Sequence, residues 1–237
     1  MATAKKKNEV EGASAKSALI FEIDNVALGA RRIRYEVLAG ILQEQGIELT
    51  PVLYSRYCLH PAPSAFMPSF LKLMNYKAAA PAQVIERVMG ETVSRLMQKT
   101  TVVNEGLIKW IQAAAGRGAA VACVSMLPQE SADAVAAHLG FDRWDVRVFS
   151  GQPNGEDRSF PRAEHWLRMS KAIERNPTRC LALVSSMFTA KTALAAMMNV
   201  VAVPDEFTEY QDFGGANLVC ADLKEVKPNA FFEEISF

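Results

Sequence analysis

Residues 18–28 read ALIFEIDNVAL, an apolar run that ends in two carboxylates, Glu22 and Asp24, separated by one residue. An uninterrupted apolar run of this length is typical of a strand that is buried on both faces of a parallel sheet. Ligands of such sheets bind at the carboxyl ends of the strands. The two acids therefore stand where a functional site is expected. The alternative interpretation is that they are loop acids that only cap the end of the sheet.

The composition is that of a globular protein with a balanced charge. The chain has 237 residues, of which 50% are hydrophobic and 22% are charged, and its formal net charge is +0. This length is sufficient for one sizeable core and a smaller second one. A chain without net charge has no overall field that would gather nucleic acid or an anionic membrane, and no run is long and apolar enough to span a bilayer. We therefore expect neither a nucleic-acid partner nor a membrane partner.

The cysteines and the first residues indicate the compartment. Cys58, Cys123, Cys180 and Cys220 have no CxxC spacing, and three of them lie inside apolar runs. They are interpreted as reduced core residues of a cytoplasmic protein. Residues 1–16 are rich in lysine but lack the apolar segment of a secretory signal, so we expect a disordered tail. Its lysines are interpreted as solvated, with docking of a partner as the alternative.

Only helical signals follow the first strand. Apolar residues at helical spacing, glycine stops and Thr50-Pro51 as a helix start predict several helices, the last of them beginning at Pro81. We expect these helices to form a separate unit over residues 31–101. The remaining segments, 17–30 and 102–237, are expected to form the core.

From Asn104 onward, predicted helices alternate with short apolar strands. The expected strands are 119–125, 146–149, 180–184 and 200–203, and the expected helices between them are 104–116, 129–139, 163–175 and 189–198. This alternation predicts a doubly wound parallel sheet with helices on both faces. Polar residues follow several strands, and we expect them to converge on one site: Glu22, Asp24, Ser125, Ser185 and Ser186.

This layout, with the phrases FEIDNVAL, VACVSML, CLALVSS and VVAVPDEFTEYQDFGGANLV, resembles the haloacid dehalogenase superfamily. The resemblance is to its β-phosphoglucomutase-like, CbbY-like phosphatases and covers nearly the whole chain from Ser17. It implies a Rossmann-like α/β core, a doubly wound parallel sheet, with an inserted all-helical cap domain after the first strand. It also implies an Asp-x-Asp motif with a covalent nucleophile and a general acid/base, a hydroxyl and a lysine that hold the phosphoryl oxygens, and late-strand acids that hold magnesium.

Two residues match that motif set and others depart from it. By the resemblance, Asp24 is the acid/base and Ser125 is the phosphate-binding hydroxyl, whereas Glu22 stands at the position of the nucleophilic aspartate. A glutamate carries its carboxylate further out by one C–C bond, about 1.5 Å. A displacement of about 1 Å can cost on the order of 10²-fold in rate. The resemblance thus implies a catalytic set that is altered at its nucleophile.

The remaining motifs depart further. In the segment GEDRSFPRAEHW, proline spacing puts Arg158 at the position of the lysine, so the resemblance gives it a catalytic and substrate-binding role. At the end of the strand CLALVSS, Val184 and Ser185 occupy the positions of the acidic pair. Magnesium prefers oxygen ligands in near-octahedral geometry, and this exchange removes a carboxylate from that set. We expect the metal site of Glu22, Asp24 and Ser185 to be vacant.

The segment HPAPSAFMPSF, which begins at His60, lies where the resemblance places a substrate-specificity loop of the cap. On that basis His60 and Ser64 are candidates for substrate binding. The prolines and aromatic residues of this segment equally favour packing between helices, and this alternative stays open.

Two functions follow from these departures. The first is a weakly catalytic or non-catalytic homologue that binds a small phosphorylated metabolite or a protein partner and needs no cofactor. The alternative is an active phosphatase or hydrolase that uses Glu22 and Asp24, with magnesium as its cofactor. The missing late-strand acids favour the first function.

Overall fold

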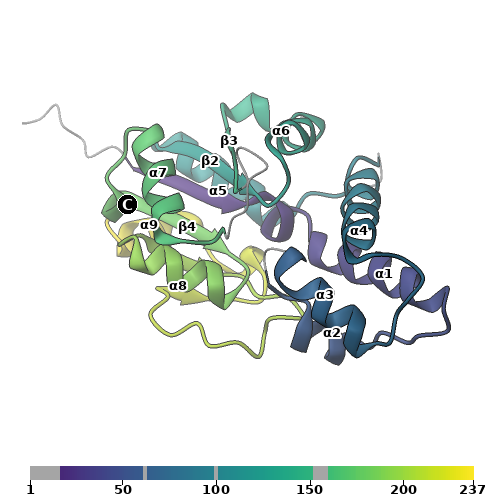
Figure 1. The fold of residues 1–237 in the computed structure, drawn as a ribbon. Coiled ribbons are helices and arrows are strands. Elements are labelled where there is room, and N and C mark those ends of the chain that lie inside the picture. Colours follow the sequence, from purple (N-terminus) through teal and green to yellow (C-terminus); the bar gives the residue numbers. More distant parts are fainter. Residues whose placement is uncertain (1–16, 61–62, 99–100, 152–159) are drawn as a thin grey trace, which may run out of the picture.

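The computed structural model describes residues 17–60, 63–98, 101–151 and 160–237 (Figure 1). The predicted disordered tail and the predicted role of Arg158 lie outside the described residues. The elements are β1 (Ala18–Glu22), α1 (Ala30–Gln43), α2 (Pro51–Tyr57), α3 (Pro63–Leu73), α4 (Pro81–Leu96), α5 (Glu105–Gly116), β2 (Ala120–Ser125), α6 (Gln129–His138), β3 (Arg147–Ser150), α7 (Ala163–Ala172), β4 (Cys180–Val184), α8 (Met187–Ala195), β5 (Asn199–Ala202), β6 (Leu218–Val219) and α9 (Pro228–Glu234). Short helical turns also lie at Ile23–Ala27, Phe141–Trp144, Pro177–Arg179 and Leu223–Glu225.

The strands form one parallel sheet in the order β3-β2-β1-β4-β5-β6. β1 is central and pairs with both β2 and β4, so that Phe21 lies beside Cys123 and Leu183. All five residues of β1 are buried, as its continuous apolar pattern predicts. The predicted doubly wound parallel sheet is confirmed.

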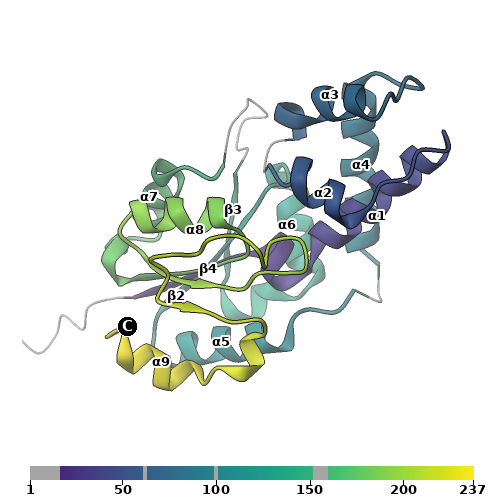
Figure 2. The ribbon, with the colours of Figure 1, turned by 90° about the horizontal axis from the view of Figure 1, so that it is seen from below.

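Each face of the sheet carries its own hydrophobic core. One core joins the sheet to α5, α6 and α9 around the fully buried Trp110, and the other joins it to α7 and α8 around the fully buried Trp166. Alternate residues of β1 point into the two cores, since Leu19 and Phe21 belong to the first whereas Ala18 and Ile20 belong to the second. Figure 2 shows the sheet between these two helical layers.

The helices α1 to α4 form an all-helical insertion between β1 and β2, and Figures 1 and 2 show it beside the sheet. The insertion has a third hydrophobic cluster, which includes Leu38, Tyr54 and Phe70. One member of this cluster, Phe207, comes from the segment that follows β5 of the core. The insertion is therefore packed onto the core through a side chain of a distant segment.

The positions of the elements differ from expectation at their ends. The last strand of the expected set, 200–203, is observed at Asn199–Ala202, and the helix expected at 189–198 is observed at Met187–Ala195. The strand β6 was not predicted, because it has only two residues and therefore shows no alternation of apolar and polar side chains. Among the described residues, every helix is too short or too polar to cross a membrane.

Candidate functional site

The site lies where the chain leaves β1. Glu22 is the last residue of the strand, and the residues Ile23–Ala27 form a single π-helical turn that brings Asp24 to the end of the sheet. Gly29 then adopts a φ of +62°, and α1 begins directly after it. A positive φ is readily accessible only to glycine, so this residue permits the turn from the sheet into the insertion. Both carboxylates are buried, Glu22 being 5% and Asp24 being 4% exposed.

Asp24 and Ser125 form a closed hydrogen-bonded pair. The Ser125 hydroxyl donates to Asp24 Oδ1 at 2.7 Å, and the Met126 N–H donates to Asp24 Oδ2 at 2.7 Å. The Leu127 N–H donates to Ser125 Oγ at 3.0 Å. The structure thus brings together the two residues that match the family motifs. It also shows that the donors expected to hold a phosphoryl group are occupied by the carboxylate of Asp24.

Glu22 is joined to Arg31 through Ser185. The Ser185 hydroxyl donates to Glu22 Oε2 at 2.5 Å, and Arg31 Nη2 donates to Ser185 Oγ at 2.9 Å. Ser185 follows β4, the strand beside β1, and it is fully buried. The residue at the position of a late-strand acid therefore supplies a hydroxyl that bridges a carboxylate and a guanidinium.

Arg31 is held from its other side by the segment after β5. Arg31 Nη1 forms an ion pair with Asp205, and only 8% of the Arg31 side chain is exposed. Asp205 is itself fixed, because its Oδ1 accepts a hydrogen bond from the Phe207 N–H at 3.0 Å and its own N–H donates to Thr208 Oγ1 at 3.0 Å. The Thr208 hydroxyl also donates to the Ser185 carbonyl at 2.9 Å. Arg31 is thus fixed between two segments that follow neighbouring strands.

Burial and the polar neighbours of Glu22 act on its pKa in opposite directions. Burial raises the pKa of Glu22, while the hydrogen bond from Ser185, the nearby Thr189 hydroxyl and the charge of Arg31 act in the opposite direction, with burial the larger effect. Glu22 Oε1 is buried and has no hydrogen-bond partner among the described residues. Thr189 instead bonds Ser186, at 2.9 Å between the two hydroxyl oxygens. A buried acceptor without a donor is costly, so this atom marks a place where a donor from a ligand would be favourable.

A cavity of about 40 Å³ lies beside these groups, between the end of the sheet and the helical insertion. It is lined by Glu22, Asp24, Asn25, Arg31, Arg34, Tyr54, Cys58, Leu59, His60, Val124, Met126, Phe160, Ser186 and Thr189. In this conformation the space suffices for a few water molecules. Within the part of the chain that is described, Arg34 has one hydrogen-bond partner, Asn25, at 3.2 Å.

The two substrate-binding candidates of the insertion lie in different places. His60 lines the cavity, and its ring lies 6.1 Å from that of Phe188. Ser64 does not line it, because residues Pro63–Leu73 form a helix that buries Met67, Phe70 and Leu71, and leaves Ser64 exposed. The role of Ser64 in substrate binding stays a prediction.

Arg31 and Asp205 were not predicted as residues of the site, nor were Arg34 and Thr189, which line the cavity. Asp205 follows β5 at the carboxyl edge of the sheet, so the rule that selected Ser125 and Ser185 would have selected it too. Arg31 gave a weaker signal, since it is one of three arginines in the segment ARRIR, of which Arg32 is mostly exposed. Its role depends on the long-range contact with Asp205.

The donor set does not fit a magnesium ion of the kind that the resemblance implies. The described residues contain no group of three or more His, Cys, Asp or Glu side chains that are placed to hold a metal ion. Glu22 Oε2 accepts from Ser185, both Asp24 oxygens accept from neighbours on β2 and the turn after it, and Arg31 bonds Ser185. A guanidinium on the ligand face repels a divalent cation.

Comparison with known proteins gives the fold. No protein-family model and no curated protein sequence matches the chain. Among solved structures, a CbbY mutant from Rhodobacter sphaeroides in complex with xylulose 1,5-bisphosphate is 15% identical, with a TM-score of 0.73, and the match covers 89% of this chain and 96% of that one. A β-phosphoglucomutase from Clostridium difficile is 17% identical, with a TM-score of 0.71 and coverages of 93% and 97%. A haloacid dehalogenase-like protein of unknown function from Agrobacterium tumefaciens is 16% identical, with a TM-score of 0.75 and coverages of 94% and 100%.

The chain has the haloacid dehalogenase fold. The resemblance stated from the sequence is confirmed at the level of this fold. Identities of this size say nothing about activity, so the function has to be argued from the residues of the site.

Proposed function

We propose that this protein of haloacid dehalogenase fold binds a small phosphorylated metabolite between the sheet and the helical insertion, and that it does not catalyse magnesium-dependent phosphoryl transfer. In this proposal the insertion acts as the cap of the site. The observation that carries it is the hydrogen bond from Ser185 to Glu22. By the resemblance, Glu22 stands at the position of the nucleophile and Ser185 stands at the position of a metal-binding acid. Ser185 therefore offers Glu22 a neutral hydroxyl where a metal site would need a second carboxylate.

The case for an anionic ligand rests on the charges that face the cavity. Arg31 and Arg34, one helical turn apart on α1, both line it, and Ser186 and Thr189 add hydroxyls from the start of α8. Guanidinium groups bind phosphate through paired N–H donors. The solved CbbY structure that resembles this chain holds a sugar bisphosphate, which makes a phosphorylated metabolite a suitable class of ligand.

The carboxylates limit the affinity. Glu22 and Asp24 repel a phosphate dianion, and Asp24 already accepts the hydrogen bonds of Ser125 and Met126. An anion has to displace Asp24 from these donors or bind beside Arg34. We expect inorganic phosphate to bind with a Kd on the order of 0.1–1 mM, which corresponds to roughly 4–5.5 kcal/mol.

The same charges argue against phosphoryl transfer. Without a cation between them, two carboxylates repel the phosphoryl group that one of them would attack. Glu22 Oε2 is engaged by the Ser185 hydroxyl, and the carboxylate is buried at the end of β1. Arg31 and Arg34 can orient and neutralise an anion, but the two carboxylates do not assemble an in-line nucleophile.

Isotope-edited NMR titration with inorganic phosphate tests the proposal. We expect amide shifts around Ser125 and on α1 that saturate in the millimolar range without magnesium and that tighten as pH falls toward 5, because a carboxyl takes up a proton. Arg34→Ala is expected to weaken binding about tenfold, whereas Arg32→Ala serves as the matched control, since Arg32 pairs with Glu206 on the surface. The proposal would be contradicted by absent shifts at high millimolar phosphate, or by affinity that weakens on acidification, and contact with a protein partner would then be the better explanation.

A second candidate function, hydrolysis that uses Glu22, is favoured by one atom of its carboxyl group. Glu22 Oε1 is buried without a donor among the described residues, and burial raises the pKa of Glu22, as is common for a general acid or base. A hydrolase that uses Glu22 with Asp24 would need this carboxyl. Turnover that is abolished in Glu22→Gln, with phosphate binding retained, would favour this function.

A further inference from the structure

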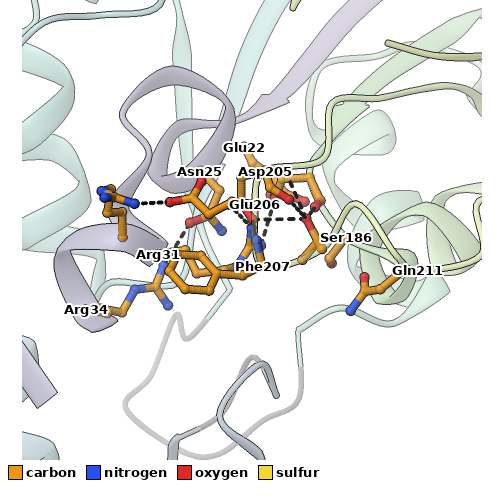
Figure 3. A network of polar contacts seen from close by, with 12 residues as sticks. Glu22, Asn25, Arg31, Arg34, Ser186, Asp205, Glu206, Phe207 and Gln211 are labelled. Atoms are coloured by element: carbon orange, nitrogen blue, oxygen red, sulfur yellow. Dashed lines mark hydrogen bonds and ion pairs between the residues drawn. The ribbon is translucent and has the colours of Figure 1, made fainter. Parts of the chain in front are cut away.

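Arg31 occupies a distinctive place among the charged groups of the site. Its guanidinium bonds Ser185 Oγ with Nη2 and pairs with Asp205 through Nη1, so it lies between the segments that follow β4 and β5 (Figure 3). Ser185 in turn donates a hydrogen bond from its hydroxyl to Glu22 Oε2. One cation is therefore connected to an acid at the end of β1, Glu22, and to an acid that follows β5, Asp205.

The position of Arg31 is fixed by the fold as well as by charge. Arg31 is in the first turn of α1, and its carbonyl accepts a hydrogen bond from the Tyr54 hydroxyl at 3.3 Å. Asp205 is held by Thr208 and by the N–H of Phe207, whose ring is buried in the core of the insertion. A guanidinium that is fixed on both sides in this way is present before any ligand arrives.

The charges make Arg31 difficult to remove. Glu22 and Asp24 are almost fully buried, and buried carboxylates are costly unless a cation or hydrogen-bond donors compensate them. The residue at the position of the late-strand acid, Ser185, cannot add negative charge for a divalent ion, but its hydroxyl can accept from a guanidinium and donate to a carboxylate at once. Serine in place of the acid removes one negative charge, and Arg31 adds one positive charge beside Glu22. The Ser185 hydroxyl accepts from Arg31 and donates to Glu22, so both changes fit one hydrogen-bonded arrangement.

We infer that Arg31 is the built-in cation of this site: it balances Glu22 through Ser185 and excludes a divalent metal ion from the space between Glu22 and Ser185. The inference deepens the proposed function and shares with it the location of the site. It adds that loss of metal binding has two coupled causes, the missing acid and the resident guanidinium, so that restoring the acid alone is insufficient.

The test compares three variants by titration calorimetry with MgCl₂ alone. Ser185→Asp restores the acid but leaves Arg31 to pair with it, so we expect no measurable binding of Mg²⁺. Ser185→Asp with Arg31→Ala removes the resident cation, and we expect binding at least tenfold tighter than in Ser185→Asp. Ser185→Asp with Arg32→Ala is the matched control, because it removes the adjacent, exposed arginine and the same formal charge.

Two results would overturn the inference. One is equal Mg²⁺ affinity in the Arg31 and Arg32 double variants, which would show that only net charge matters. The other is no gain in the Arg31 double variant although its circular dichroism spectrum and melting curve are native-like. If Arg31→Ala does not fold, Arg31→Met keeps the length of the side chain and gives the same comparison. Failure here is distinguishable from failure of the proposed function, which is decided by phosphate binding to the unmodified protein.

Discussion

Phe207→Ala removes the side chain that links the core to the helical insertion. Phe207 is 1% exposed, and its ring centroid lies 5.3 Å from that of Tyr35 and 5.0 Å from that of Tyr54. It follows Asp205, which pairs with Arg31, so the same segment supplies both the apolar and the ionic contact to α1. Truncation leaves a cavity in the core of the insertion and loosens the support of the Arg31 site.

The expected loss follows from this burial. Replacing a buried phenylalanine by alanine costs about 3–5 kcal/mol, and the two edge-on or tilted ring contacts argue for the upper part of that range. Urea denaturation measures the change in the free energy of unfolding, and hydrogen exchange of the α1 and α2 amides shows whether the insertion loosens first. Tyr210→Phe is the control, because it removes one hydrogen bond, from a 63% exposed residue to the Ser55 carbonyl at 2.9 Å, and should cost no more than about 1 kcal/mol. A loss below about 1 kcal/mol for Phe207→Ala, or one equal to that of the control, would refute the reasoning.

Three further outcomes follow from local geometry. Gly106→Ala places a Cβ 2.8 Å from Leu223 Cβ and should lower the free energy of unfolding by about 1–3 kcal/mol, whereas Gly116→Ala meets open space in the same helix and should not, as urea denaturation will show. Burial raises the pKa of the Cys58 thiol to about 12, so Ellman's reagent at pH 8 should label it in the unfolded chain and spare it in the folded one. Burial raises the pKa of Glu22, so the folded protein binds a proton on this carboxyl more tightly than the unfolded chain does. At pH 7 the neutral Glu22→Gln variant should therefore melt at a higher temperature than the unmodified protein. This difference in melting temperature should shrink as pH falls through the raised pKa. A constant advantage from pH 8 to pH 5 would contradict this assignment.

Periodicity predicted the sheet because its strands are buried on both faces. The continuous apolar runs of β1, β2 and β4 are typical of strands that are covered on both sides. The helices between them carry caps such as Asn104, whose side chain accepts from the Gly106 and Leu107 N–H groups at 2.9 and 3.3 Å. Element ends were less accurate, and the π-helical turn after Glu22 was not foreseen, because such turns have no sequence period of their own.

The candidate site was predictable in its location and less so in its connections. Strand ends selected Glu22 and Asp24, which line the cavity, and Ser125 and Ser185, which donate hydrogen bonds to these two carboxylates. Which donor bonds which acceptor depends on side-chain geometry: Asp24 turns to Ser125, and Ser185 turns to Glu22. The contact of Arg31 with Asp205 joins residues 174 positions apart, and no local pattern specifies such a pair.

The central claim is that the altered site does not transfer phosphoryl groups, and turnover measures it directly. We expect the purified protein to hydrolyse p-nitrophenyl phosphate and sugar phosphates no faster in millimolar magnesium than in a metal chelator. The reason is that Ser185 supplies a hydroxyl where a magnesium site would need a carboxylate, and the Arg31 guanidinium bonds that hydroxyl. Magnesium-dependent turnover on the order of 1 s⁻¹ or more, an ordinary enzyme rate, that disappears in Glu22→Gln would contradict the account.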